Sequence, residues 1–267
     1  MVVNKVTGHY QIIDAHNHVW SKDGKLNIED MENLLEAAER VGINRLCVST
    51  PLNTPCPKPD EFRKCNDIVF EAMKKTDKFI GFCFVNPGYV RETLDEIQRC
   101  VVDGGMAGVK LYHHYFICDP ALTPLLEKAA ELKIPVLMHA GKVMDTATRL
   151  AQPRLSNAEH FIKAAKMFPE TIFIQGHIGG GGDWEWNLRM LEDSPANIYL
   201  DTSGSVIDGG IVRKTVAALG EDRVLFATDM AFEEGVGKIL DAGLSETQMR
   251  KIFHDNISGI LNRRKVK

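Results

Sequence analysis

Several side chains that could bind a metal stand near the ends of short apolar segments in this sequence. They are His16, His18, His139, His177 and Asp229. Residues two apart in a strand point to the same side, so His16 and His18 can present two imidazoles to one ion. Imidazole and carboxylate groups bind zinc and other divalent transition metals, and catalytic sites of this kind keep open positions for water. One such histidine is weak evidence, but five residues together predict a metal site.

The apolar segments belong to a pattern that repeats along the chain. Short runs rich in β-branched and aromatic residues alternate with longer segments of helical periodicity, which is typical of βα units and a parallel sheet. The predicted strands are Gln11–Ala15, Arg45–Thr50, Phe79–Val85, Ala107–Tyr112, Pro135–His139, Thr171–His177, Ile198–Thr202 and Arg223–Asp229. The predicted helices are Ile28–Val41, Asp60–Lys75, Arg91–Val102, Ala121–Lys133, Ser156–Phe168, Asp183–Leu191, Gly210–Leu219 and Glu233–Ala242.

Eight strand–helix pairs of about 33 residues account for the chain as a (β/α)8 TIM barrel, an α/β fold. A doubly wound open sheet is the alternative, but it would normally carry a glycine-rich turn where this sequence reads DAHNH. No linker marks a boundary, so we predict a single metal-dependent hydrolase domain over residues 1–267. The helical stretch 245–262 is expected to pack across the bottom of the barrel. Catalytic groups should then stand at the C-terminal ends of the strands.

Composition and charge exclude several classes of protein. The chain is 44% hydrophobic and 25% charged, which is typical of a globular protein. Its net charge of −4 removes the main electrostatic argument for binding nucleic acid or an anionic membrane. The sequence has no long apolar run and no signal-peptide pattern, so we expect a cytoplasmic protein. The six cysteines form no CxxC motif, and Cys47, Cys83 and Cys100 are expected to be free core residues.

Seven motifs, in chain order, resemble those of the amidohydrolase superfamily, specifically its amidohydrolase-related (amidohydrolase 2) branch of metal-dependent hydrolases and decarboxylases. They are IIDAHNHVW, GFCFVNPG, GVKLY, VLMHAG, QGHIGG, YLDTSG and LFATDM. The tail HDNISGILN is similar to the family's closing helix. The resemblance implies a TIM barrel in which one divalent metal is held by His16, His18, His139 and Asp229. It also implies that His177 lies beside the metal-bound water.

The leading functional hypothesis is a metal-dependent hydrolase. A bound divalent metal lowers the pKa of water to about 7, and His177 and Asp229 are the expected catalytic residues that remove its proton. The expected substrate is a small organic molecule with an amide, ester or lactone bond. The alternative is a nonoxidative decarboxylase, a lyase, that acts on an aromatic or muconate-type acid. A metal-binding protein without catalysis is a third hypothesis, and it would require a site closed to water.

The number and the type of metal ions form a second set of expectations. Zinc is favoured, although manganese and iron accept the same ligands. Lys110 ends the fourth predicted strand, where binuclear relatives carry a carboxylated lysine that bridges two ions. We favour one ion, with Lys110 as a fixed positive charge that pairs with Asp229 or with a substrate carboxylate. No partner beyond a small-molecule substrate is predicted, and a homo-oligomer is left open.

The loops at the mouth of the barrel are expected to set substrate specificity. They span residues 51–59, 112–120 and 141–155. Weaker candidates for substrate contact within them are His113, His114, Arg149 and Arg154. The glycine run 179–182 lacks the lysine and hydroxyl residue of a phosphate-binding loop. We expect it to let the backbone pass close to the metal site.

Overall fold

The computed structural model of this protein describes residues 7–178 and 182–265. Its main sheet has eight parallel strands, and each strand pairs with the next main-sheet strand along the chain. The strands are β1 (Ile13–His18), β4 (Arg45–Ser49), β5 (Phe79–Phe84), β6 (Gly108–Leu111), β7 (Pro135–Met138), β8 (Ile172–Gln175), β9 (Ile198–Asp201) and β10 (Val224–Leu225). This sequential order confirms the single-domain TIM barrel and excludes a doubly wound sheet, in which the strand order reverses.

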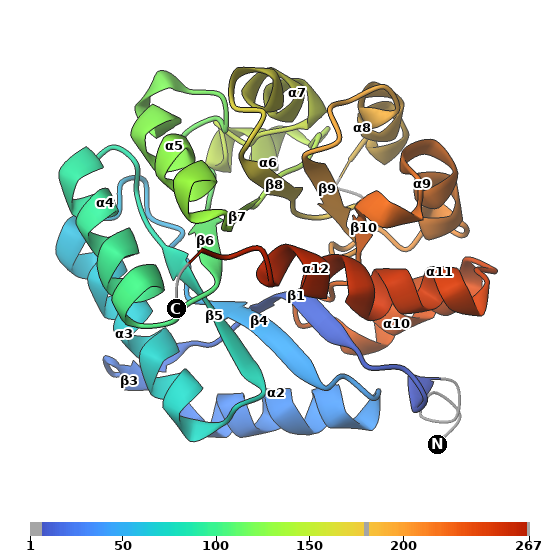
Figure 1. Ribbon diagram of the computed structural model, residues 1–267, viewed down its shortest axis with the longest axis horizontal. Coiled ribbons are helices and arrows are strands. Elements are labelled where there is room, and N and C mark those ends of the chain that lie inside the picture. The colour runs from blue at the N-terminus through green and yellow to red at the C-terminus, as the bar shows by residue number, and fades with distance from the viewer. Residues whose placement is uncertain (1–6, 179–181, 266–267) are drawn as a thin grey trace.

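Helices between the strands surround the sheet (Figure 1). They are α2 (Ile28–Arg40), α3 (Pro59–Lys75), α4 (Val90–Ile97), α5 (Thr123–Leu132), α6 (Thr146–Ala151), α7 (Ala158–Met167), α8 (Trp184–Leu191), α9 (Ile211–Leu219), α10 (Phe232–Asp241), α11 (Glu246–Arg250) and α12 (Asn256–Leu261). In α2, the side chain of Asn27 caps the first turn, and Met31, Leu34 and Ala38 are buried at helical spacing. Within the described ranges, none of the helices has the length and apolar character needed to span a membrane.

Two apolar layers hold the barrel together. The larger layer lies between the sheet and the helices, and it contains Cys83 and Cys100. A smaller cluster fills the inside of the barrel; it contains Cys47 together with residues at the start of the strands, such as Ile13. α12 adds Ile257 and Ile260 to this inner cluster, so it covers the N-terminal end of the barrel, as predicted for the C-terminal segment. The opposite end is therefore the one available for chemistry.

Few hydrogen bonds close the barrel between its last and first strands. Asp229 N donates to His16 O at 2.9 Å. The ladder of β10 ends at Leu225, earlier than the predicted strand 223–229, because Phe226 N donates to Ile252 O at 3.0 Å. Thr228 N donates to the carboxylate of Asp14, at 3.1 Å. The seam thus places Asp229 directly beside His16.

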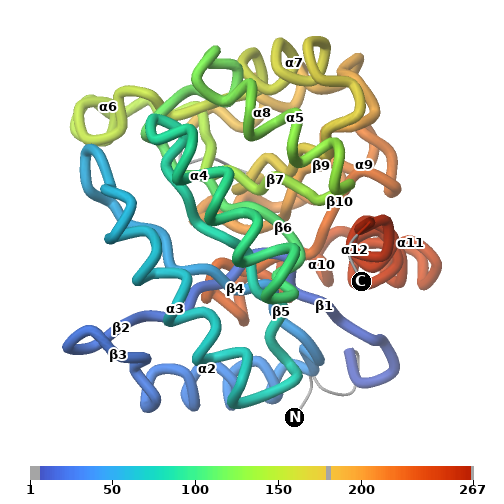
Figure 2. Tube along the Cα trace, turned by 60° about the vertical axis from the view of Figure 1, so that its left-hand side comes forward, coloured from blue at the N-terminus to red at the C-terminus, as the bar shows by residue number. Residues whose placement is uncertain are grey.

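A short hairpin and a short helix lie outside the predicted set. β2 (Ser21–Lys22) and β3 (Lys25–Leu26) form a hairpin after β1. Its turn is Asp23–Gly24, and both residues have positive φ, 52° and 77°, as the favoured two-residue hairpin turn requires. The second element is α6, which forms within the predicted loop 141–155. Figure 2 shows α6 at the edge of the molecule, next to the segment that follows β4.

Candidate active site

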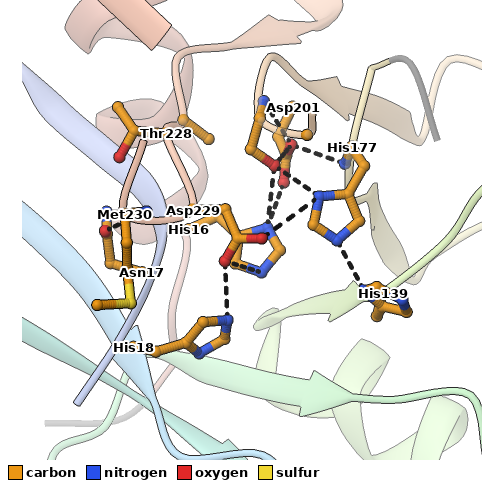
Figure 3. A network of polar contacts seen from close by, with 12 residues as sticks. His16, Asn17, His18, His139, His177, Asp201, Thr228, Asp229 and Met230 are labelled. Atoms are coloured by element: carbon orange, nitrogen blue, oxygen red, sulfur yellow. Dashed lines mark hydrogen bonds and ion pairs between the residues drawn. The ribbon is translucent and has the colours of Figure 1, made fainter. Parts of the chain in front are cut away.

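The residues predicted to do chemistry meet at the C-terminal end of the barrel (Figure 3). His16 and His18 lie on β1, and His139, His177 and Asp229 follow β7, β8 and β10. His16, His18 and His177 are buried, whereas the side chain of Asp229 is 29% exposed. Asp229 and the partly buried His139 are therefore the members of this group that an entering molecule reaches first.

A β-bulge in β1 aims His16 into the barrel. Just before Asn17, β1 contains one residue more than its partner strand β4, and such a bulge redirects a side chain. The ring of His16 reaches across to Asp201 on β9, with Nδ1 2.9 Å from the carboxylate. His18 still lies beside His16, with ring centroids 5.2 Å apart. The prediction that both imidazoles face one site is therefore consistent with their positions.

Asp229 lies among three histidines. Its carboxylate is 3.0 Å from Nε2 of His18, 3.9 Å from Nε2 of His16 and 3.8 Å from Nδ1 of His177. The ligand atoms of His16, His177 and Asp229 all fall within 4.8 Å of one another. His139 lies outside this group, with its Nδ1 2.7 Å from Nε2 of His177. The donor set, imidazole nitrogens and one carboxylate, suits a divalent transition metal.

Asp201 contributes to the site, although the sequence analysis does not identify it. It is fully buried at the end of β9, and its carboxylate accepts hydrogen bonds from His16 Nδ1 at 2.9 Å, His177 N at 2.9 Å and Ser203 Oγ at 2.6 Å. Burial raises its pKa, but the electrostatic interaction and the hydrogen bond with His16 outweigh burial and hold the pKa well below its usual range. Its position near the end of the predicted strand Ile198–Thr202 was the sequence feature that could have identified Asp201 as a site residue.

The bond to Asp201 also fixes the tautomer of His16. The carboxylate is ionised and can only accept, so the proton lies on Nδ1 of His16. The lone pair on Nε2 then points toward Lys110, whose Nζ is 2.5 Å away. A lone pair that faces the centre of the site is the form in which a histidine binds a metal.

Burial keeps the other histidines of the site neutral. It lowers the pKa of His18 to about 4, and the hydrogen bond to Asp229 offsets this only in part. Burial, together with the electrostatic interaction with His16, lowers the pKa of His177 to about 4. Burial, with the electrostatic interaction of the neighbouring His177, also holds the pKa of His139 well below its usual range. Near pH 7 these imidazoles are therefore in the form that binds metals.

Lys110 is fully buried at the end of β6, and burial lowers its pKa to about 8. Among residues 7–178 and 182–265, no carboxylate lies within ion-pair distance of its ammonium group. The expected direct pairing with Asp229 is therefore absent, although the charge of Asp229 raises the pKa of Lys110. A positive charge beside His16 is the role that its position supports, and the preference for an uncarboxylated Lys110 stays a prediction.

His113 and His114, two of the weaker candidates for substrate contact, form hydrogen bonds with the loop that follows β4. Nε2 of His113 is 2.8 Å from the side-chain oxygen of Asn53, and Nε2 of His114 is 2.8 Å from the carbonyl oxygen of Thr54. Arg154 donates to the carbonyl oxygen of His114 at 3.0 Å. These contacts join the loops after β4, β6 and β7 around a cavity of about 360 Å³.

The glycine run lies mostly outside the described residues, since only Gly182 of residues 179–182 is described. Gly182 forms a bridge with Val143, and a Cβ at this position would stand 2.0 Å from the carbonyl oxygen of Lys142. At Gly182, the close backbone approach is therefore to the 141–155 loop.

Acid is expected to destabilise the chelator-treated protein between pH 6.5 and pH 4. The pKa of His18 and His177 is about 4 in the folded chain against 6.5 as the ordinary value, so the unfolded chain binds more protons in this window. The stabilisation is complete above pH 6.5 and declines as the pH falls, by about 3 kcal/mol for each histidine. Urea unfolding followed by circular dichroism from pH 7.5 to pH 4.5 measures the effect. A His18→Gln variant should show a shallower decline, and a constant urea midpoint in the parent protein would contradict the burial argument.

Comparison with known proteins adds to this geometry. The sequence model of a family described as "Amidohydrolase" matches residues 13–262. The chain is 24% identical to the γ-resorcylate decarboxylase of Rhizobium sp. (strain MTP-10005), over 78% of each chain. A crystal structure of 2,6-dihydroxybenzoate decarboxylase with 2,6-dihydroxybenzoate matches with a TM-score of 0.73 and 17% identity, covering 95% of this chain and 99% of that one. A 5-carboxyvanillate decarboxylase from Novosphingobium aromaticivorans, complexed with manganese, matches with a TM-score of 0.74 and 15% identity, covering 95% and 96%.

These relatives correct the leading functional hypothesis. The expectation of a hydrolase that cleaves an amide, ester or lactone bond is wrong, because the matching curated relatives are γ-resorcylate decarboxylases, and the similar solved structures include a 2,6-dihydroxybenzoate and a 5-carboxyvanillate decarboxylase. The findings favour the alternative, a nonoxidative decarboxylase. The motifs could not separate the two reactions, since they fix where imidazoles and a carboxylate meet and do not fix which bond of the substrate breaks.

Proposed function

Because the chain belongs to the amidohydrolase family, we propose that it is a metal-dependent decarboxylase that removes carbon dioxide, without oxidation, from a hydroxylated aromatic acid. The observation that carries the proposal is the position of Asp229, ionised and partly exposed among His16, His18 and His177. Similarity to decarboxylases of dihydroxybenzoate and carboxyvanillate supports the substrate class.

We assign one divalent metal to His16, His18, His139 and Asp229, with His177 beside them. The neutral imidazoles and the ionised carboxylate fit such an ion. When bound, it would supply a positive charge that orients and polarises the oxygens of an acidic substrate. Both zinc and manganese suit this set of ligands. The similar 5-carboxyvanillate decarboxylase structure is a complex with manganese. His177 lies closer to Asp229 than His139 does in the described geometry, so both positions need to be tested by substitution.

Decarboxylation breaks the bond between the carboxylate carbon and the ring. Carbon dioxide leaves, the electron pair stays on the ring carbon, and that carbon must then accept one proton. A hydroxyl group ortho or para to the carboxylate supplies electron density that makes the ring carbon easier to protonate. The reaction therefore requires a proton donor at the mouth of the barrel, in contact with the ring.

Asp229 is the proposed proton donor. Burial raises its pKa, but the electrostatic interaction with His16 and the hydrogen bond from His18 hold the pKa well below its usual range, so Asp229 is ionised at rest and passes to the ring a proton that it takes up from solvent. Nδ1 of His177 lies 3.8 Å from the Asp229 carboxylate, a separation that one bridging water would span, so solvent protons would reach Asp229 at this point. Lys110 adds a buried positive charge beside Nε2 of His16, the ring nitrogen that also faces Asp229, and this charge favours an anionic substrate.

An assay of carbon dioxide release tests the proposed function. Protein loaded with Mn²⁺ or Zn²⁺ is incubated with a panel of hydroxybenzoates, including 2,6-dihydroxybenzoate, and with a matched panel of aryl esters and lactones. We expect carbon dioxide and the corresponding phenol from at least one acid. Cleavage of the esters or lactones without carbon dioxide release from any acid would overturn the proposal.

Replacing Asp201 with Asn is expected to weaken metal binding by about 10–100-fold. An amide group facing His16 would donate to Nδ1, which would move the ring proton to Nε2 and remove the lone pair from the site. Calorimetric titration of the chelator-treated variant with Mn²⁺ measures the affinity.

Ser203→Ala serves as the control for this change. It removes the hydrogen bonds of Ser203 Oγ to Asp201 and to Nδ1 of His177 but leaves the Asp201 carboxylate and its bond to His16 in place. Its affinity for Mn²⁺ should therefore stay within a few-fold of the parent protein. Equal affinities in the Asp201→Asn variant and the parent protein would show that this carboxylate does not set the tautomer of His16.

A further inference from the structure

A second hollow lies beside the candidate active site, under the 141–155 loop. It has a volume of about 410 Å³, within the range of small-molecule sites. Its lining includes Phe116, Lys142, Arg149, Gln152 and His160. The side chain of Gln152 joins the hollow to the active site, because its amide oxygen lies 3.0 Å from Nε2 of His139. A molecule that contacts both His139 and the hollow would therefore take the place of the Gln152 side chain.

The hollow is positively charged. Two of its lining residues are cations, Lys142 and Arg149, and none of the residues that line it is an aspartate or a glutamate. Within the described part of the chain, neither cation has a carboxylate at ion-pair distance. The nearby Asp145 is engaged elsewhere, since it accepts a hydrogen bond from Thr148 N at 2.7 Å and caps α6.

Aromatic rings hold the cation and one wall of the hollow in place. The ammonium of Lys142 lies 3.9 Å from the centre of the Trp186 ring, a cation–π contact that positions the charge without neutralising it. The rings of Phe116 and His160 stack with centroids 4.2 Å apart and planes 9° apart. They present a flat surface against which part of an aromatic substrate can pack.

We propose that the hollow lined by Phe116, Lys142, Arg149, Gln152 and His160 binds a second carboxylate, so that the preferred substrates are aromatic diacids. One carboxylate lies at the metal-binding residues, and the other pairs with Arg149 and Lys142. An arginine fork matches the two oxygens of a carboxylate, and the ammonium adds a point charge. The proposal rests on the proposed function for the reaction, although binding in the hollow can be measured without turnover.

Calorimetric titration with isophthalate and benzoate tests the proposal. These acids differ by one carboxylate, and each is titrated into the Mn²⁺-loaded protein. We expect isophthalate to bind about 10-fold or more tightly than benzoate in the parent protein. The double variant Lys142→Ala/Arg149→Ala should lose this preference and keep its affinity for benzoate. Steady-state kinetics should then show a raised KM for hydroxylated diacids and an unchanged KM for the matching monoacids.

A matched control separates a built site from general charge attraction. Lys74→Ala/Arg189→Ala removes the same charge from exposed positions on α3 and α8, and it should retain the preference for isophthalate. Equal binding of the two acids by the parent protein, or equal loss of preference in the two double variants, would overturn the subsite. A preference for isophthalate without carbon dioxide release would support the subsite while contradicting the decarboxylase. Carbon dioxide release from monoacids, without tighter binding of isophthalate than of benzoate, would support the decarboxylase while contradicting the subsite.

Discussion

The Asp229→Asn variant is expected to lose about 10³-fold or more in kcat for decarboxylation while keeping its fold. The loss falls within the usual contribution of a positioned proton donor, about 10²–10⁴-fold. The amide cannot deliver a proton to the ring carbon, and it places no negative charge between His16 and His18. The measurement is kcat at saturating Mn²⁺, so that any weaker binding of the metal does not enter the comparison.

Asparagine is the suitable replacement because of the backbone at this position. Asp229 has a φ of 49°, in the left-handed region that asparagine tolerates better than most residues. The hydrogen bond from its backbone N–H to His16 O is also preserved. A circular dichroism spectrum and a melting temperature like those of the parent protein are therefore expected. A folded, Mn²⁺-saturated variant that retained more than about a tenth of the parent kcat would rule out Asp229 as the proton donor.

The second large effect is expected for His18→Ala, which should reduce the affinity for Mn²⁺ by at least about 100-fold, the upper end of what loss of an outer hydrogen-bond partner costs. The change removes an imidazole whose Nε2 lies 3.0 Å from Asp229. Metal bound to the folded state raises stability, by about 2.7 kcal/mol at 100 times the dissociation constant. The melting temperature of the parent protein should therefore rise with added Mn²⁺, and that of the variant should stay constant.

His254→Ala is the matched control for this measurement, because His254 lies near the C-terminus and contacts Asp255, away from the barrel mouth. It should show the same Mn²⁺-dependent rise in melting temperature as the parent protein. If the His18→Ala variant still gained stability at the same Mn²⁺ concentrations, the proposed set of ligands would be wrong.

Much of the fold could be predicted from the sequence, because each barrel unit repeats the same local pattern. Strands such as Arg45–Ser49 and helices such as α2 agree with the predictions to within a residue. The main shift is at β1, predicted as 11–15 and found at Ile13–His18, which includes both histidines. The prediction ended this strand at residue 15 because the following residues are Asn and His, which are not typical of strands.

The composition of the active site could be predicted more fully than its internal contacts. The strand ends place His16, His139 and Asp229 at one rim, and this follows from topology alone. The contact of His16 with Asp201 depends on a bulge and on the diameter of the barrel, which no local pattern specifies. Gln152 reaches His139 only because α6 forms within a loop that was expected to be irregular.

The bond that the enzyme breaks was the least predictable property. Imidazoles, a carboxylate and a divalent metal serve hydrolysis and decarboxylation alike, and the choice depends on how the mouth loops place a substrate. The basic hollow around Arg149 is formed by residues far apart in the sequence, so its charge becomes evident only once the loops are folded.

The most direct test of the account is to follow carboxyl-¹³C-labelled hydroxybenzoates and hydroxyisophthalates in D₂O with the Mn²⁺-loaded protein. We predict labelled carbon dioxide and an aromatic product that carries one deuterium at the carbon that held the carboxylate. The absence of labelled carbon dioxide from every acid, in a protein that is folded and binds Mn²⁺, would contradict the proposal that this chain is a decarboxylase.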